Sequence, residues 1–432
     1  MLPAFLSLPS EQLALLRLVA GEASTRGLPA YVVGGFVRDV LLKRSGQDMD
    51  IVVAGDAIAL ARALARKHGG RVTVHKRFGT ASWQNGAEGA ENGEQKEQSL
   101  FSTPYFLDFI TARSETYARP AALPDVTPSS LEDDLRRRDF TINAMAVRLD
   151  GEHFGELVDE HHSAADLEHG LVRVLHDGSF RDDPTRMFRA VRYEQRYGFR
   201  IDAHTLELVP EALPLVRLLS AERVRHELDM LLDEPRAATM LARLAGLGLL
   251  AAVEPALPWS AAVQQRLHSG LSSILGAGWE PGAIRADGSL RVALGYALWL
   301  LDLAPAQIET LQTRLVFPGA ILKTIRAAAV LWARLPGLRG GSPSQWVEAL
   351  EGSPLPAIFA VYQASGDGAL EQYALRWRHI HPGLDGEALK RLGIPPGPAY
   401  KKILRRLRAA WLDREVRTPE QERQLLEKLL AT

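Results

Sequence analysis

The segment from Tyr31 to Val53 limits the fold most strongly, because it places a strand, two glycines, a helix and a second strand in succession. Tyr31-Val32-Val33 has β-strand character, Gly34 and Gly35 follow it, and the apolar residues of Phe36–Leu42 have helical spacing. Glycines at such a turn let backbone N–H groups approach a phosphate, and the helix N-terminus adds favourable partial charge. The segment therefore predicts an α/β region with a phosphate-binding turn.

The second strand of this segment carries two carboxylates at its start. Asp48 and Asp50 are two residues apart, so both side chains point to one face of a strand. Two such charges are costly together unless a cation lies between them, and oxygen ligands of this type suit Mg²⁺. Asp108, on a later strand, is a third candidate, and an acid at the edge of the core is its alternative interpretation. We expect Asp48 and Asp50 to hold Mg²⁺ and all three acids to form a phosphoryl-transfer site.

Strand and helix patterns alternate in the first third of the chain and then give way to helices. Between two of the predicted strands, residues 85–99 are polar and rich in Gly and Glu, which predicts a disordered excursion. From Ala203 onward, helical patterns interrupted by Pro and Gly continue to the end. The sequence predicts an α+β fold in which a mixed sheet precedes an all-helical remainder. A helix is expected at 57–68, and further strands at 71–75, 79–84 and 105–112.

Two arginine-rich segments follow the predicted strands. Arg136-Arg137-Arg138 precedes an apolar run, and the planar guanidinium group suits the oxygens of a triphosphate, although a solvated charge run is the common alternative. In the second segment, Pro184 fits the first turn of a helix, with Asp183 near its cap. Asp183, Arg186 and Arg189 can share a helix face. An Asp beside an Arg could read the edge of C or A, and a surface salt-bridge ladder is the alternative.

The C-terminal region contains a predicted basic helix. Residues 399–411 hold five basic side chains and no acid. Lys401, Lys402 and Arg405 would lie on one broad face, where they could bind RNA phosphates. A solvated amphipathic helix is the alternative interpretation.

Composition excludes several classes of protein and leaves others open. The 432 residues contain no Cys, which excludes disulfides, thiolate catalysis and zinc sites with Cys ligands. The net charge of −1 means that any nucleic-acid binding must depend on local basic patches. The longest strongly apolar run, Val292 to Leu301, is about half of what a membrane-spanning helix needs. We expect a cytoplasmic protein without a targeting signal or membrane association, and no obligate protein partner is evident.

Taken together, these motifs resemble the class II tRNA nucleotidyltransferases, a family of CCA-adding enzymes and poly(A) polymerases. The order and spacing agree over roughly residues 30–200 through the segments Val33–Asp39, Asp48–Asp50, Arg137–Met145 and Asp182–Arg192. The resemblance implies a nucleotidyltransferase head related to DNA polymerase beta at 1–150. A helical neck with a base template would follow at 151–217, a helical body at 218–310 and a tRNA-binding helical tail at 311–432.

The resemblance also implies roles for individual residues. Mg²⁺ held by Asp48 and Asp50 would activate the tRNA 3′-hydroxyl for attack on the α-phosphate of CTP or ATP, releasing pyrophosphate. Asp183 and Arg186 would act as a protein template for the base, supported by Arg189 and Arg192. The residues that would contact the incoming nucleotide from the first two motifs are Gly34, Gly35, Arg38 and Arg138.

Departures from the family pattern leave the specificity open. Asp182 stands where the family usually has Glu, and the segment 157–167 keeps Asp159 and Asp166 but lacks the usual pair of glycines. Residues 111–120 resemble relatives that add only CC or only A. CCA, CC and A addition thus remain alternatives. A poly(A) polymerase acting on other RNAs is a further alternative, although strongly basic terminal extensions are missing. A catalytically silent RNA-binding protein is another, and the intact aspartate pair argues against it.

Overall fold

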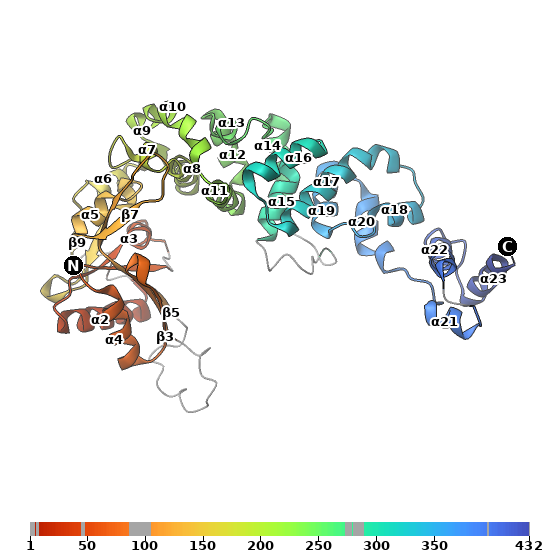
Figure 1. The fold of residues 1–432 in the computed structure, drawn as a ribbon, viewed down its shortest axis with the longest axis horizontal. Helices are drawn as coiled ribbons and strands as arrows, with labels where there is room; N and C mark the ends of the chain where they lie inside the picture. The colour runs from red at the N-terminus through yellow and green to blue at the C-terminus, as the bar shows by residue number, and fades with distance from the viewer. Residues whose placement is uncertain are drawn as a thin grey trace. The chain divides into compact units, whose positions relative to one another are not determined.

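The computed structural model describes residues 5, 8–44, 48–85, 105–272, 279, 289–394 and 397–431. The chain divides into two compact units, Met1–Leu219 and Ser220–Thr432. The first unit combines a mixed sheet with helices, and the described residues of the second unit form helices (Figure 1). The predicted α+β fold class is confirmed. The four-part division at 150, 217 and 310 stays a prediction, and the Glu-rich excursion lies outside the described residues beyond Asn85.

A seven-stranded sheet in the order β3-β4-β5-β2-β1-β8-β9 forms the centre of the first unit. Within it β2 and β5 are parallel, and the other neighbouring pairs are antiparallel. The strands predicted from the sequence are confirmed, whereas β8 and β9, which lie beyond β1 at one end of the sheet, were not predicted. The strands are β1 (Ala30–Val33), β2 (Met49–Val53), β3 (Arg71–His75), β4 (Thr80–Asn85), β5 (Tyr105–Thr111), β8 (Ala146–Arg148) and β9 (Leu157–Val158).

Helix α4 (Ala57–His68) covers one face of this sheet and packs against β3, β4 and β5. The helix forms because its apolar residues recur at helical spacing and because Asp56 caps it by accepting from Ala59 N at 2.9 Å. Alternate strand residues, among them Ile51, Leu107 and Phe109, are fully buried. Because side chains alternate along a strand, Asp50 and Asp108 lie on the opposite face.

The rest of the first unit consists of helices of varied length and two pairs of short strands. A two-stranded hairpin and a parallel strand pair join the helices there, and these four strands were not predicted from the sequence. The hairpin is β6 (Arg113–Thr116) with β7 (Asp125–Pro128), and the parallel pair is β10 (Leu171–Val172) with β11 (Arg200–Ile201). The helices are α2 (Ser10–Thr25), α3 (Gly35–Leu41), α5 (Leu131–Arg136), α6 (Ser163–Glu168), α7 (Ser179–Asp182), α8 (Thr185–Tyr197), α9 (Ala203–Glu207) and α10 (Val209–Ala212).

The second unit packs its helices around aromatic residues such as Tyr296 and Trp299, which are fully buried. The apolar run at 292–301 is part of this core, and no described helix is both long and apolar enough to cross a membrane. The helices are α11 (Ala221–Asp233), α12 (Ala237–Gly246), α13 (Leu249–Val253), α14 (Ala261–Ser272), α15 (Leu290–Trp299), α16 (Pro305–Leu315), α17 (Gly319–Leu338), α18 (Pro343–Leu350), α19 (Leu355–Ser365), α20 (Gly368–Leu375), α21 (Gly386–Arg391), α22 (Pro398–Leu412) and α23 (Pro419–Leu430).

Candidate active site

The predicted carboxylates meet at the junction of β2 and β5. The register of this parallel pair places Asp50 directly beside Asp108, on strands about 4.8 Å apart. Asp48 comes immediately before the first residue of β2. On β4, Ser82 is paired with Asp108 and its hydroxyl donates to the Asp108 carboxylate. Segments far apart in the sequence thus bring acidic oxygens together on one sheet face.

The electrostatics of this face favour a cation. Burial raises the pKa of the Asp50 carboxyl; Arg138 opposes the shift, and the negative charges of Asp108 and Asp48 add to it. A divalent ion would relieve this repulsion, because its charge would lie between the carboxylates. Among the described residues, however, no three His, Asp or Glu side chains are arranged to hold a metal ion. The Mg²⁺ site at Asp48 and Asp50 therefore stays a prediction.

The glycine turn at the end of β1 lies against Arg138. Gly34 has φ +68°, and a Cβ atom there would lie 2.5 Å from Arg138 Nη1, so only glycine suits both the conformation and the contact. Arg138 is fixed by donating to Asp134 Oδ2 at 3.0 Å and to the Asn143 carbonyl at 3.4 Å. The structure thus brings together Gly34, Gly35 at the start of α3, and the arginine predicted to contact the nucleotide.

Arg38 on α3 is only 5% exposed and is engaged by protein groups. It donates to Asn143 Oδ1 at 2.5 Å and to both Asp39 carboxylate oxygens at 2.9 and 3.1 Å. Its guanidinium also lies over the rings of Tyr197 and Tyr193, 4.7 and 5.3 Å from their centroids. In this arrangement Arg38 joins α3 to α8, and its predicted contact with a nucleotide stays a prediction.

Arg186 and Arg189 of α8 contact the segment that follows α5. Arg189 Nη2 lies 2.8 Å from Asp139 Oδ2, and Asp139 also accepts from Phe140 N at 2.9 Å and Asn143 Nδ2 at 2.8 Å. Burial acts to raise the pKa of Asp139, but Arg189 and the Asn143 hydrogen bond outweigh it and hold that pKa below its ordinary value. The two arginine-rich motifs are therefore joined by an ion pair whose carboxylate is buried and whose arginine is partly exposed.

The predicted base-reading residues make internal contacts in this structure. Asp183 Oδ1 accepts from Thr185 N at 2.9 Å and Thr185 Oγ1 at 2.6 Å, which caps α8 near the predicted position. Arg186 is 5% exposed and donates to Ser179 Oγ at 2.6 Å and the Arg137 carbonyl at 2.8 Å. Arg192, also buried, lies over the ring of Tyr193. None of these contacts tests whether the side chains read a base, and that role stays a prediction.

The segment that departs from the family pattern has a defined local structure. Asp159 accepts from Ser163 N at 2.7 Å and Ala164 N at 3.0 Å, and so caps α6. Asp166 accepts from Thr141 Oγ1 at 2.7 Å. His162 has φ +56°, a conformation that glycine adopts more readily. The two aspartates that the sequence retains thus have structural partners.

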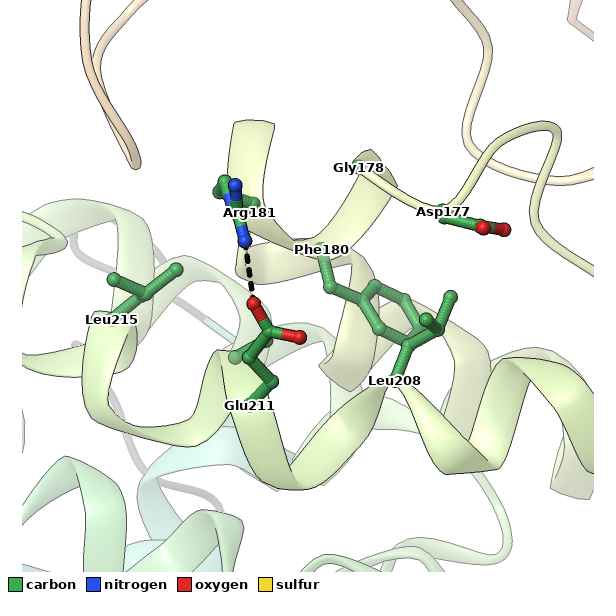
Figure 2. Close-up of a pocket in the computed structure, with 8 residues that line it drawn as sticks. Asp177, Gly178, Phe180, Arg181, Leu208, Glu211 and Leu215 are labelled. Atoms are coloured by element: carbon green, nitrogen blue, oxygen red, sulfur yellow. Dashed lines mark hydrogen bonds and ion pairs between the residues drawn. The ribbon is translucent and has the colours of Figure 1, made fainter.

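A pocket of about 300 Å³ lies in the first unit beside α7 and α10. Figure 2 shows Arg181 extended toward Glu211, and these side chains form an ion pair at 2.5 Å. None of the predicted catalytic or nucleotide-binding residues lines this pocket. The lining residues are Asp177, Gly178, Phe180, Arg181, Leu208, Glu211, Ala212 and Leu215.

The basic helix α22 has a mixed character. Ile403 and Leu407 pack into a small core with Leu389 and Leu426, as the amphipathic pattern predicts. Lys401 and Lys402 are exposed, without a carboxylate in ion-pair distance among the described residues, whereas Arg405 is paired with Glu348. The predicted basic face is therefore partly neutralised, and its role in RNA binding stays a prediction.

Comparison with known proteins relates the whole chain to one family. Residues 30–173 match the Poly A polymerase head domain, and residues 198–259 match the probable RNA and SrmB-binding site of polymerase A. A CC-adding tRNA nucleotidyltransferase of Geobacter sulfurreducens is 30% identical, over 99% of this chain and 97% of that protein. The chain belongs to the tRNA nucleotidyltransferase family. The family predicted from the motifs is confirmed.

Other members of the tRNA nucleotidyltransferase family extend this result. An A-adding tRNA nucleotidyltransferase of Geobacter sulfurreducens is 34% identical, over 98% of this chain but only 47% of that longer protein. The chain thus spans about half the length of that relative. The structure of the Thermotoga maritima CCA-adding enzyme complexed with tRNA is 27% identical and has a TM-score of 0.75, with 99% of this chain and 97% of that chain covered.

Some residues at this candidate site were not singled out from the sequence. Asp134 is fully buried and pairs with Arg137 and Arg138, at spacings of three and four residues that a helix brings together. Ser82 could be found only through the register of β4 with β5. Phe106 stands two residues before Asp108, so the alternation of a strand already places both on one face.

Proposed function

We propose that this protein adds nucleotides to the 3′ end of tRNA from ATP or CTP, without a nucleic-acid template. The observation that carries the proposal is the pairing of Asp50 with Asp108 on neighbouring strands, beside the turn where Gly34 contacts Arg138. Relatives named for A and CC addition, and a structural neighbour solved with tRNA, support the same activity.

Asp48 and Asp50 would hold Mg²⁺, and Asp108 would complete the acidic face. Their oxygen donors and mutual repulsion fit a divalent cation. When bound, the ion supplies charge neutralisation on the transferring phosphoryl group and lowers the pKa of the attacking hydroxyl. The protein positions the reactants, which is the main catalytic demand of phosphoryl transfer.

The arginine side of the site would bind the incoming nucleotide. Gly34 and Gly35 expose backbone N–H groups at the start of α3, and Arg138 beside them carries a charge suited to phosphate. Arg38 would add charge from α3. Asp183 and Arg186 would read the base after exchanging internal hydrogen bonds for base contacts, with Arg189 and Arg192 as supports. The tRNA would be recognised through its shape and backbone, with Lys401, Lys402 and Arg405 as contacts in the second unit.

Among the alternatives for specificity, addition of A has the stronger support. The A-adding relative is 34% identical and the CC-adding relative from the same organism is 30% identical. Residues 111–120 also resemble members with split specificity. We place the enzyme in the cytoplasm, where its proposed substrates are found.

The test uses three tRNAs that end at the discriminator base, at C74 and at C75, each incubated separately with radiolabelled ATP and CTP. The proposal predicts incorporation of A on the tRNA ending at C75, with release of pyrophosphate. Incorporation of C on the shorter primers would transfer the assignment to CC or CCA addition. No incorporation on any tRNA would contradict the proposed function and would leave a silent RNA-binding protein. Long A tracts on unrelated RNAs would instead indicate a poly(A) polymerase.

A further inference from the structure

The sheet face that carries the carboxylates continues as an open surface over β5, β4 and β3. The registers align Phe106 with Gln84, and Gln84 with Arg71, across these three strands. Directly opposed residues of antiparallel strands share a face, so the three side chains form one row. On the parallel neighbour β2, Met49 pairs with Leu107, so Asp48, one residue earlier, lies level with Phe106. The row therefore ends beside the acidic site.

Phe106 is a large apolar side chain that this surface leaves uncovered. It is 60% exposed, whereas the adjacent Leu107 and Phe109 on the other face are fully buried under α4. Phe106 and Asp108 are two residues apart on one face, which corresponds to about 7 Å along the strand. An exposed aromatic ring beside a carboxylate centre contributes nothing to the core, and it provides a flat surface on which a base can stack.

Arg71 at the far end of the row supplies positive charge. It is exposed, and no carboxylate among the described residues lies within ion-pair distance of it. Two strand spacings separate it from Phe106, or about 10 Å. A cation at this distance from a stacking surface matches a nucleotide chain whose base lies on the ring and whose backbone phosphate meets the guanidinium group.

The topology determines which substrate approaches this row. The proposed nucleotide-binding groups, Gly34 and Arg138, lie on the β1 side of the carboxylates, whereas β4 and β3 lie on the opposite side. In phosphoryl transfer the attacking and leaving oxygens are roughly in line across the phosphorus atom. If the triphosphate lies on the β1 side, the attacking hydroxyl must approach from the β5 side.

We infer that Phe106 is a positioning residue on which the 3′-terminal base of the RNA substrate stacks, and that Arg71 binds a phosphate of the same RNA end. The inference rests on the proposed function, because it assigns the RNA strand to the face opposite the nucleotide. Stacking on Phe106 holds the terminal ribose, and hence its 3′-hydroxyl, beside Asp108. Arg71 holds the preceding backbone.

The test is a double-mutant cycle measured as equilibrium binding. A tRNA ending at C75 is compared with the same tRNA lacking only the 3′-terminal base, and Kd is measured for the wild type, Phe106→Ala and Phe106→Tyr. The wild type should lose about 10-fold in affinity when the base is removed, as expected for one stacked base. Phe106→Ala should bind the intact tRNA about 10-fold more weakly and should not respond to base removal, and Phe106→Tyr should behave as the wild type.

Phe78→Ala is the matched control, because Phe78 is an exposed phenylalanine (48%) near the opposite end of the same strands. It should leave the response to base removal unchanged. Arg71→Gln tests the phosphate contact. It should weaken the binding of both tRNAs equally and reduce the salt dependence of Kd by about one phosphate contact. Arg62→Gln, an exposed arginine on the covering helix α4, should do neither.

The outcomes separate this inference from the proposed function. A Phe106→Ala variant that still distinguishes the two tRNAs, or a wild type that never does, would overturn the inference even if nucleotides are incorporated. Conversely, a wild type that shows the stacking response but incorporates no nucleotide would contradict the proposed function alone. If neither tRNA binds, both are wrong. Unchanged melting temperatures would show that the variants are folded.

Discussion

The two sides of the carboxylate centre differ in how their cationic side chains are held. On the β1 side, Arg38, Arg138 and Arg189 form ion pairs with Asp39, Asp134 and Asp139, respectively. The first two arginines are largely buried, and Arg189 is partly exposed. On the β3 side, Arg71 is exposed, and so is the ring of Phe106. The same sheet therefore borders a rigid ionic network on one side and an open surface on the other.

A fixed side and an open side suit two unlike substrates. A triphosphate is small and charged, and binding sites for it gain from donors fixed before binding, since little reorganisation is then required. The end of an RNA chain must enter, move by one nucleotide and leave, which an open stacking surface permits.

The largest effect is expected at the centre that both sides share. Asp50→Asn keeps the shape of the side chain but removes a ligand charge, so nucleotide incorporation should fall on the order of 1000-fold. Filter binding should show that tRNA affinity is nearly unchanged. Asp125→Asn, an exposed aspartate on β7, is the control and should retain activity. Loss of tRNA binding or of the fold in Asp50→Asn would mean that the carboxylate is structural.

The rigid side depends on the buried carboxylate of Asp139 and its ion pair with Arg189, which Asp139→Asn removes. We expect a loss of about 1.5–3 kcal/mol in the free energy of unfolding, because the hydrogen bonds that Phe140 N and Asn143 donate to Asp139 lose their charged acceptor and Arg189 keeps only a neutral partner. Urea denaturation measures this loss, and Glu132→Gln on the exposed surface of α5 should change it little. The folded pKa of Asp139 lies below its unfolded value, so its contribution is present at neutral pH and is lost as the pH falls through the folded pKa. An equal loss in both variants would argue against a special role for this pair.

The contact between the glycine turn and Arg138 gives the next effect. Gly34→Ala combines backbone strain of about 1–3 kcal/mol with displacement of Arg138, so KM for the nucleotide should rise. Gly69→Ala is a matched control, because Gly69 also has positive φ (+74°) but open space where the Cβ atom would stand. It should lower stability without changing KM. A rise in KM for both variants would show that strain alone is responsible.

Much of this comparison could be predicted from the sequence, and the remainder depends on tertiary pairing. The spacing of Asp48 and Asp50, the glycines and the helix at 57–68 followed from local rules of alternation and helical period. The partners of Arg186 and Arg189 could not be predicted by such rules, because a run of arginines indicates positive charge but not which carbonyl or carboxylate lies opposite. The short strands β8 to β11, two or three residues each, exist through pairing rather than propensity.

The smallest effects are expected in the second unit, where exposed and paired cations lie on one helix. Lys401→Gln and Lys402→Gln should each weaken tRNA binding a few-fold and reduce its salt dependence by about one phosphate contact. Arg405→Gln should do less, because its charge is already paired with Glu348. A series of Kd values at increasing salt measures both quantities. Equal effects of all three variants would show that the pairing does not decide which cations meet RNA.

The most direct test of the two-sided site compares KM for tRNA with KM for ATP in two variants, Phe106→Ala and Arg138→Gln. Removal of the exposed ring should raise KM for tRNA about 10-fold and leave KM for ATP unchanged. Removal of the fixed guanidinium should raise KM for ATP and leave KM for tRNA unchanged. If both variants raise the same KM, or if the two effects are exchanged, the assignment of one substrate to each side of the carboxylates is wrong.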